Sequence, residues 1–356
     1  MKRCLAFSEL QAPVSGQASD AGVSRLPALQ VLRGLAAVLV VLFSIGSSFA
    51  ETSQQNVNPF AIGAIAVDIF FVMSGFVIAY SMRSENTMLH FLVCRLARVA
   101  PLYWFLTTVI ICISILSAQL SGGATPNSEH ILRSYLIIPY QRDDGRIQPL
   151  FGLAWTLCYE VYFYIIFSLC LCTGRLAPWV ACLLLAINVL AGQVWSSKVV
   201  LWQFYTDPII AEFAFGILLS RLYIWQKGFV KADAFSSTML AFGAFVLYRS
   251  DPGLPHVVHH GLVAALIVSA FLWLPPIRGR WVACLVVLGD ASYALYLSHP
   301  FLLRAVIKLS SPHLSDDLFS LSTAPALVFA LAIALLMHQI VERPAQAFLL
   351  RYLGRP

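Results

Sequence analysis

Charged residues are scarce in this sequence. Asp, Glu, Lys and Arg together make up 11% of its 356 residues, whereas hydrophobic residues make up 59%. A soluble globular domain carries roughly 25% charged residues. A soluble fold of this size needs more polar surface than this chain supplies, which indicates that lipid surrounds most of it.

The sequence also lacks the signatures of several enzyme classes. It has no Gly-rich nucleotide loop, no G-x-S-x-G elbow and no H-E-x-x-H motif. No apolar core follows Lys2 and Arg3 closely enough to form a secretory signal peptide. The formal net charge of +6 is better explained by Lys and Arg on cytoplasmic loops than by binding to nucleic acid.

Long apolar runs are what the sequence has instead, and they predict an all-α, polytopic membrane protein of about ten transmembrane helices. The expected spans cover about residues 34–50, 61–81, 102–120, 150–172, 177–195, 208–224, 235–249, 259–275, 282–303 and 323–341. An even number of spans puts both termini on one side of the membrane. The distribution of Lys and Arg over the loops predicts that this side is the cytoplasm.

Polar groups inside the expected spans are costly and usually mark a site. Arg33 opens the first span, and Ser44 lies eleven residues later on nearly the same helix face, about 16 Å deeper. Asp68 lies in the second span, at a depth similar to that of Ser44. For Arg33 and Ser44, spacing alone leaves two interpretations open: a snorkelling arginine with small packing residues, or a functional pair.

Three further charged residues stand out in the next segments. Arg95 and Arg98 share a helix face, so they either anchor the chain to the inner surface or clamp a phosphorylated cytoplasmic donor. Glu160 lies within W-T-L-C-Y-E, too deep to belong to an interfacial aromatic belt.

The ninth expected span carries Asp290 toward its inner side and His299 near its outer end. Pro300 predicts a kink there. A histidine cluster lies at the outer end of the eighth span, where no carboxylate or Cys completes a ligand set nearby, so we expect no metal site. The cluster consists of His256, His259 and His260.

Taken in order, these segments resemble the acyltransferase-3 family of integral membrane acyltransferases, and within it the branch that acetylates exopolysaccharides. They read L-R-G-L-A-A, V-D-I-F-F-V-M-S-G-F, R-x-x-R-x-x-P-x-Y, W-T-L-C-Y-E, G-D-A-S-Y-A-L-Y-L-S-H-P and V-E-R-P. The resemblance implies a membrane domain over residues 28–349 in a bacterial inner membrane. A polar cytoplasmic segment (1–27) precedes it, and a cytoplasmic tail (350–356) follows.

The resemblance also implies an activity. The donor would be acetyl-coenzyme A, and the acceptor a hydroxyl of a lipid-linked or polymeric glycan. Other expected partners are the lipid bilayer and polysaccharide-assembly proteins. The donor's phosphates are expected near Arg33, Arg95 and Arg98. The reaction itself is expected near Asp68, Ser44 and Glu160.

One position departs from the family pattern. The family places a histidine where this chain has Ser44, and serine offers no nitrogen that titrates near neutral pH. The protein is then an inactive or regulatory relative, or it uses Asp68, Glu160 or His299 as the base, or Ser44 itself carries the acyl group with help from a base. The sequence favours the second explanation slightly over the first and places the third last.

Two other classes of function fit the same features. A transporter or flippase for a lipid-linked sugar also needs many helices and buried charges. A catalytically impaired scaffold in a polysaccharide-assembly complex would tolerate the loss of the histidine at position 44.

Overall fold

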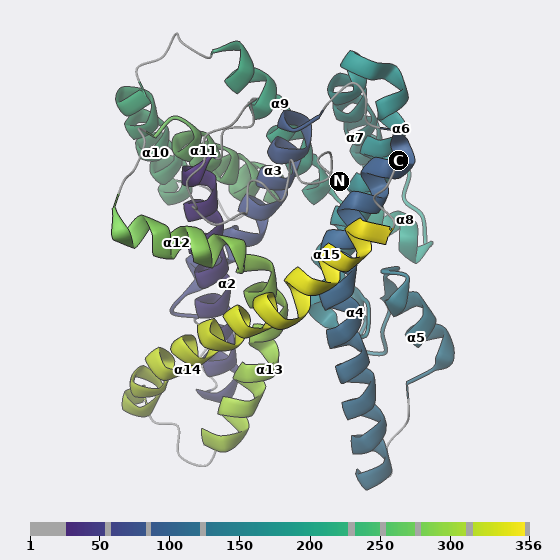
Figure 1. The fold of residues 1–356 in the computed structure, drawn as a ribbon, viewed down its shortest axis with the longest axis vertical. Helices are drawn as coiled ribbons and strands as arrows, with labels where there is room; N and C mark the ends of the chain where they lie inside the picture. Colours follow the sequence, from purple (N-terminus) through teal and green to yellow (C-terminus); the bar gives the residue numbers. More distant parts are fainter. Residues whose placement is uncertain are drawn as a thin grey trace. The chain divides into compact units, whose positions relative to one another are not determined.

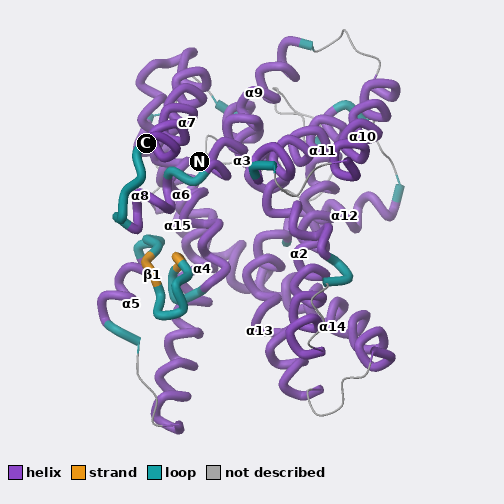
Figure 2. The backbone as a smooth tube through the Cα atoms, turned by 180° about the vertical axis from the view of Figure 1, so that it is seen from behind, coloured by secondary structure: helices purple, strands orange, loops and turns teal. Residues whose placement is uncertain are grey.

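The computed structural model describes residues 26–53, 58–82, 87–121, 126–226, 232–249, 254–274, 279–310 and 316–352. Their regular structure is almost entirely helical. The only strands in these ranges are β1 (Tyr140–Gln141) and β2 (Ile147–Gln148), which form one short antiparallel hairpin (Figure 2). Helices cover all ten expected spans, and the all-α prediction is confirmed.

Six helical segments of the described chain are long and apolar enough to cross a membrane, or seven if one bent pair counts as a span. They are Pro27–Ala50, Ala61–Tyr80, Met88–Leu116, Gly152–Val194, Pro208–Trp225 and Pro325–Tyr352. Gly152–Val194 covers most of two of the expected spans, 150–172 and 177–195. A 3-10 segment separates these two, and Gly174 within it adopts a positive φ of 57°. The protein is therefore a multi-pass membrane protein.

The chain divides into two compact units. The first contains the residues up to Ser81 together with Phe215–Ile340, and the second contains Met82–Ala214 and the residues from Val341 onward. The elements of the first unit are α2 (Pro27–Ser53), η1 (Ala61–Ala64), α3 (Ile65–Tyr80), most of α9 (Ala211–Trp225), α10 (Ala232–Arg249), η5 (Val257–Gly261), α11 (Leu262–Leu272), α12 (Arg280–Asp290), α13 (Ser292–Ser310), α14 (Asp316–Met337) and the start of η6 (His338–Glu342) (Figure 1).

The second unit is built from the middle of the chain and its C-terminal helix. Its elements are α4 (Met88–Ser121), α5 (Ser128–Tyr135), β1, β2, η2 (Gly152–Ala154), α6 (Trp155–Cys170), η3 (Leu171–Leu176), α7 (Ala177–Val194), α8 (Val200–Tyr205), η4 (Pro208–Ile210) and α15 (Arg343–Tyr352).

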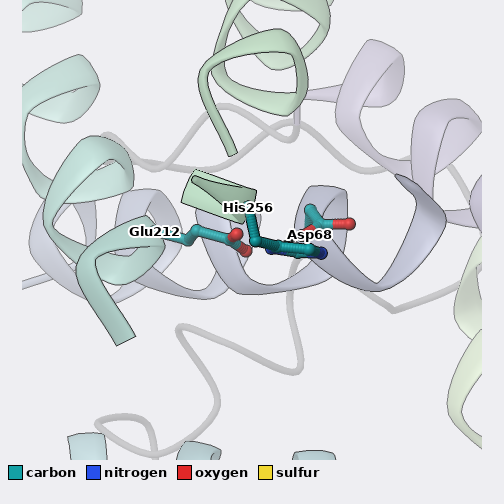
Figure 3. A group of neighbouring side chains, drawn as sticks. All are labelled: Asp68, Glu212 and His256. Carbon is teal, nitrogen blue, oxygen red and sulfur yellow. Dashed lines mark ion pairs between the residues drawn. The ribbon is translucent and has the colours of Figure 1, made fainter. Parts of the chain in front are cut away.

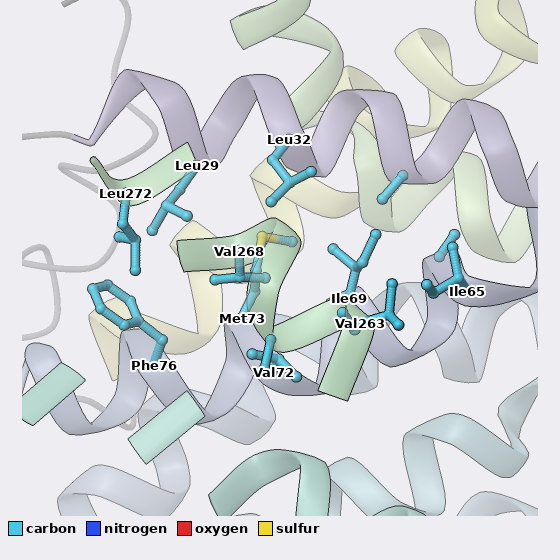
Figure 4. Packing of buried hydrophobic residues seen from close by; sticks show 14 of the residues in the cluster. Leu29, Leu32, Ile65, Ile69, Val72, Met73, Phe76, Val263, Val268 and Leu272 are labelled. Carbon is cyan, nitrogen blue, oxygen red and sulfur yellow. The ribbon is translucent and has the colours of Figure 1, made fainter. Parts of the chain in front are cut away.

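The core of the first unit lies where α2, α3 and α11 meet. Leu32 of α2, Ile69 and Val72 of α3, and Val268 of α11 are buried there together (Figure 4). Burying an aliphatic side chain of this size contributes about 1.5–3 kcal/mol relative to leaving it in water. In a bilayer the corresponding gain comes from close packing, since lipid is as apolar as leucine.

Glycines allow α2 to approach α12 closely. A Cβ atom on Gly289 would lie 2.1 Å from the carbonyl oxygen of Gln30, and one on Gly34 would lie 2.8 Å from the carbonyl oxygen of Leu285. Both contacts are with backbone, which cannot move aside as a flexible side chain does. Such small-residue contacts are typical of helix packing in membranes.

On α7 of the second unit, one face is apolar and exposed. Leu183, Ile187, Leu190 and Val194 follow each other at intervals of four, three and four residues, and each is at least half exposed. This spacing places them on one side of the helix. An exposed stripe of this kind is expected where a helix faces lipid.

The break in the ninth expected span does not lie at Pro300. Instead, α12 and α13 meet at a bend of 65° beside Ala291, and Pro300 lies inside α13. The predicted kink at Pro300 stays a prediction, since α13 continues through this residue. Since Ala291 separates the two helices, Asp290 ends one of them and Ser292 begins the next.

Candidate active site

Ser44 and His299 are hydrogen-bonded to each other although 255 positions separate them in the sequence. Ser44 Oγ, on α2, lies 3.0 Å from His299 Nε2, on α13. The other ring nitrogen of His299, Nδ1, lies 3.1 Å from the carbonyl oxygen of Leu295, one turn earlier on the same helix. Because a carbonyl oxygen can only accept, the neutral ring carries its proton on Nδ1. Nε2 is then the acceptor of the Ser44 hydroxyl proton.

The pair is embedded in apolar packing between α2, α13 and α14. Val41 and Ile45 flank Ser44 on α2, Leu295 and Leu303 lie one turn either side of His299, and alanines of α14 complete the cluster. His299 is fully buried, whereas Ser44 is half-buried. Electrostatic interactions are stronger in such surroundings than in water, so the packing both fixes and strengthens this hydrogen bond.

A second polar contact joins the same two helices. Arg33 Nη2 donates to Ser292 Oγ across 3.1 Å. Arg33 is the arginine of the opening motif, and Ser292 belongs to G-D-A-S-Y. The first motif of the chain and the G-D-A-S-Y motif thus meet along the contact between α2 and α13, which contains both Arg33 and Ser44.

Asp68 lies in the first turn of α3 and is almost completely buried. A negative charge is favoured at this end of a helix. Its Oδ1 lies 3.5 Å from His256 Nδ1, and the side chain of His256 is half exposed (Figure 3). The sequence analysis expected no carboxylate near this histidine cluster, and that expectation was wrong. Asp68 and His256 offer one oxygen and one nitrogen ligand of the types that divalent cations take.

Glu160 belongs to a network in the second unit. The hydroxyl of Tyr164 donates to Glu160 Oε1, and the charges of Glu160, Arg95 and Arg98 all act on Tyr164. Arg95 is buried, with its guanidinium 5.3 Å from the centre of the Phe91 ring, and Arg98 is half-buried. The two arginines that were predicted to bind the donor therefore share a network with a carboxylate that was predicted to act as a base.

The structure thus sorts the predicted residues into separate groups. Ser44 pairs with His299, Arg33 with Ser292, and Asp68 with His256, all within the first unit. Glu160, Arg95 and Arg98 belong to the second unit.

Sequence reasoning passed over Ser292, Tyr164 and Glu212. Glu212 is fully buried in the first turn of α9. An acidic residue inside an apolar span was a signal that could have found it.

A family model for an acyltransferase domain matches residues 26–339, which is most of the chain. The chain belongs to the acyltransferase-3 family. This confirms the resemblance of its motifs and supports acyltransferase activity. No solved structure matches the chain.

Three relatives illustrate the range of the family. The exopolysaccharide production protein ExoZ of Rhizobium meliloti is 34% identical over 83% of this chain and 93% of its own length. The acyltransferase MdmB of Streptomyces mycarofaciens is 28% identical over 94% of each chain. The putative peptidoglycan O-acetyltransferase YrhL of Bacillus subtilis is 25% identical over 90% of this chain but only 54% of its own length.

Proposed function

We propose that this protein transfers an acetyl group from acetyl-coenzyme A to a hydroxyl of an exopolysaccharide sugar, at the inner membrane of a bacterium with both termini in the cytoplasm. The observation that carries the proposal is the Ser44–His299 pair. It offers an alcohol and an imidazole nitrogen at 3.0 Å, the combination that acyl transfer uses. The family supports the reaction class, and the name of ExoZ supports the choice of acceptor.

Loss of an acyltransferase, of a transporter or of a scaffold changes different properties of the polysaccharide. In a strain that lacks this protein, we expect polysaccharide of normal amount and chain length without one of its acetyl esters. Mass spectrometry and ester analysis of the purified polymer measure both properties. Lost export with the ester retained would support a transporter and contradict our proposal, and so would a reduced amount of normally esterified polymer, which indicates a scaffold.

Arg95 and Arg98 are the residues we assign to the donor's phosphates. An arginine holds phosphate through charge-assisted hydrogen bonds, which contribute about 1.5–3 kcal/mol each. The Arg95→Ala/Arg98→Ala double variant should therefore raise KM for acetyl-coenzyme A at least tenfold and lower kcat less. Arg175→Ala is the matched control, because Arg175 belongs to the same unit and is exposed. An unchanged KM in the double variant would refute the phosphate clamp.

The sequence also predicts Arg33 near the donor's phosphates. It is half-buried and lies on the same helix as Ser44. Its Nη2 donates a hydrogen bond to Ser292 Oγ. Asp68 and Glu160 remain alternative bases for the acceptor hydroxyl.

A further inference from the structure

The hydroxyl of Ser44 is directed differently from those of three buried serines on other helices. Ser168, Ser220 and Ser269 each donate to a carbonyl oxygen three residues earlier on their own helix, at 2.7–2.8 Å. This back-bonding is the ordinary way for a helical serine to satisfy its hydroxyl. Ser44 instead bonds to a ring nitrogen on another helix.

The geometry of the pair is that of an activated nucleophile. Such a pair needs a nucleophile and a base within about 2.6–3.2 Å, and a third group that orients the base. Ser44 Oγ and His299 Nε2 satisfy the distance, and the carbonyl oxygen of Leu295 orients the ring through Nδ1. The base is fully buried, which protects its tautomer, whereas the nucleophile is only half-buried.

We propose that Ser44 is the nucleophile of this enzyme and carries the acyl group as an oxygen ester, with His299 as its general base. The inference rests on the proposed acetyl-coenzyme A chemistry. In the first half-reaction, the Ser44 hydroxyl gives its proton to His299 Nε2, and Oγ attacks the thioester carbonyl carbon. The carbon–sulfur bond breaks, the coenzyme A thiolate takes the proton from His299, and the free thiol leaves.

The second half-reaction transfers the acetyl group to the sugar. The acceptor hydroxyl gives its proton to Nε2, and its oxygen attacks the ester carbonyl carbon of acetyl-Ser44. The bond from that carbon to Ser44 Oγ breaks, and Oγ recovers the proton from His299. No oxidant, metal or further reactant is needed. In this scheme Ser44 replaces the family's histidine by taking a different role, while the imidazole comes from α13.

An acyl-enzyme predicts that the two substrates react one at a time. The donor releases coenzyme A before the acceptor binds, so initial rates should follow ping-pong kinetics. A mechanism in which the base acts directly on the acceptor requires both substrates to be present together. Labelling of the protein by acetyl-coenzyme A in the absence of acceptor separates the two mechanisms.

The test is acylation of the purified full-length protein in detergent by isotope-labelled acetyl-coenzyme A without acceptor. Mass spectrometry of proteolytic peptides should place the label on Ser44, and adding the acceptor should discharge it. Ser44→Ala and His299→Gln should each reduce labelling at least 100-fold. Ser48→Ala, which removes a hydroxyl one turn further along α2, should label as the native protein does.

A further variant keeps the test decisive if Ser44→Ala proves unstable. Ser44→Cys keeps a nucleophile of similar shape and should form a thioester that neutral hydroxylamine removes, whereas the native oxygen ester resists it. If the native protein esterifies the sugar while Ser44 stays unlabelled, or if Ser44→Ala turns over at the native rate, the acyl-enzyme is wrong and the proposed function stands. If the native protein uses no acetyl-coenzyme A at all, both fail.

Discussion

Replacing His299 with glutamine is expected to lower the rate of acetyl transfer about 100- to 10,000-fold, the usual contribution of a general base. Glutamine is similar in reach and can still hydrogen-bond to Ser44, but it has no nitrogen that takes up a proton. The variant should therefore fold and bind the donor with little change in KM, whereas kcat should fall by the factor given above. Initial rates with the purified variant measure both constants.

Asp68 and Glu160 are the alternative bases, and the loss of kcat in their variants is compared with the loss in His299→Gln. If Asp68 or Glu160 were the base, Asp68→Asn or Glu160→Gln would show the larger loss of kcat, and His299→Gln would retain most of the native rate. His130→Gln is the matched control, since the ring of His130 stacks on Tyr140 and takes no part in the site. Near-native kcat for His299→Gln would remove His299 from the mechanism.

The second large effect concerns stability. Gly289→Ala places a Cβ atom 2.1 Å from the carbonyl oxygen of Gln30, so α12 must move away from α2. Overpacking of this kind typically costs 1–3 kcal/mol or more. We expect a clear fall in the thermal unfolding midpoint in detergent, together with reduced activity, because α12 leads directly into α13, which carries His299.

Gly243→Ala provides the control for this substitution. Its added Cβ atom would meet only the Cβ atom of Leu266, at 3.6 Å, which is ordinary van der Waals contact. We expect an unfolding midpoint equal to or slightly above that of the native protein, because alanine favours helix over glycine by roughly 1 kcal/mol. Equal midpoints for Gly289→Ala and Gly243→Ala would contradict the close packing of α2 on α12.

Much of the fold follows from local patterns in the sequence. Apolar runs located the helices, because in lipid every backbone polar group must be paired within the chain. One break between helices had no local signal in the sequence. The 65° bend at Ala291, which separates α12 from α13, was not predicted.

The site was less predictable because its contacts join distant segments. Spacing placed Arg33 and Ser44 on one helix face, but nothing local indicates that His299, on the ninth expected span, lies beside Ser44. For this reason, an acyl-serine had the least support from the sequence among the three explanations for serine at position 44. The pairing of Asp68 with His256 was missed for the same reason, since helical periodicity describes one helix at a time.

The central claim is that this chain is an active acyltransferase with serine at position 44. Complementing a deletion strain with the native chain and, separately, with Ser44→His tests it most directly, with acetyl esters on the purified polysaccharide as the readout. We predict that the native chain restores the ester. If only Ser44→His restores it, the native protein is a disabled member of the family, and its role lies outside acyl transfer.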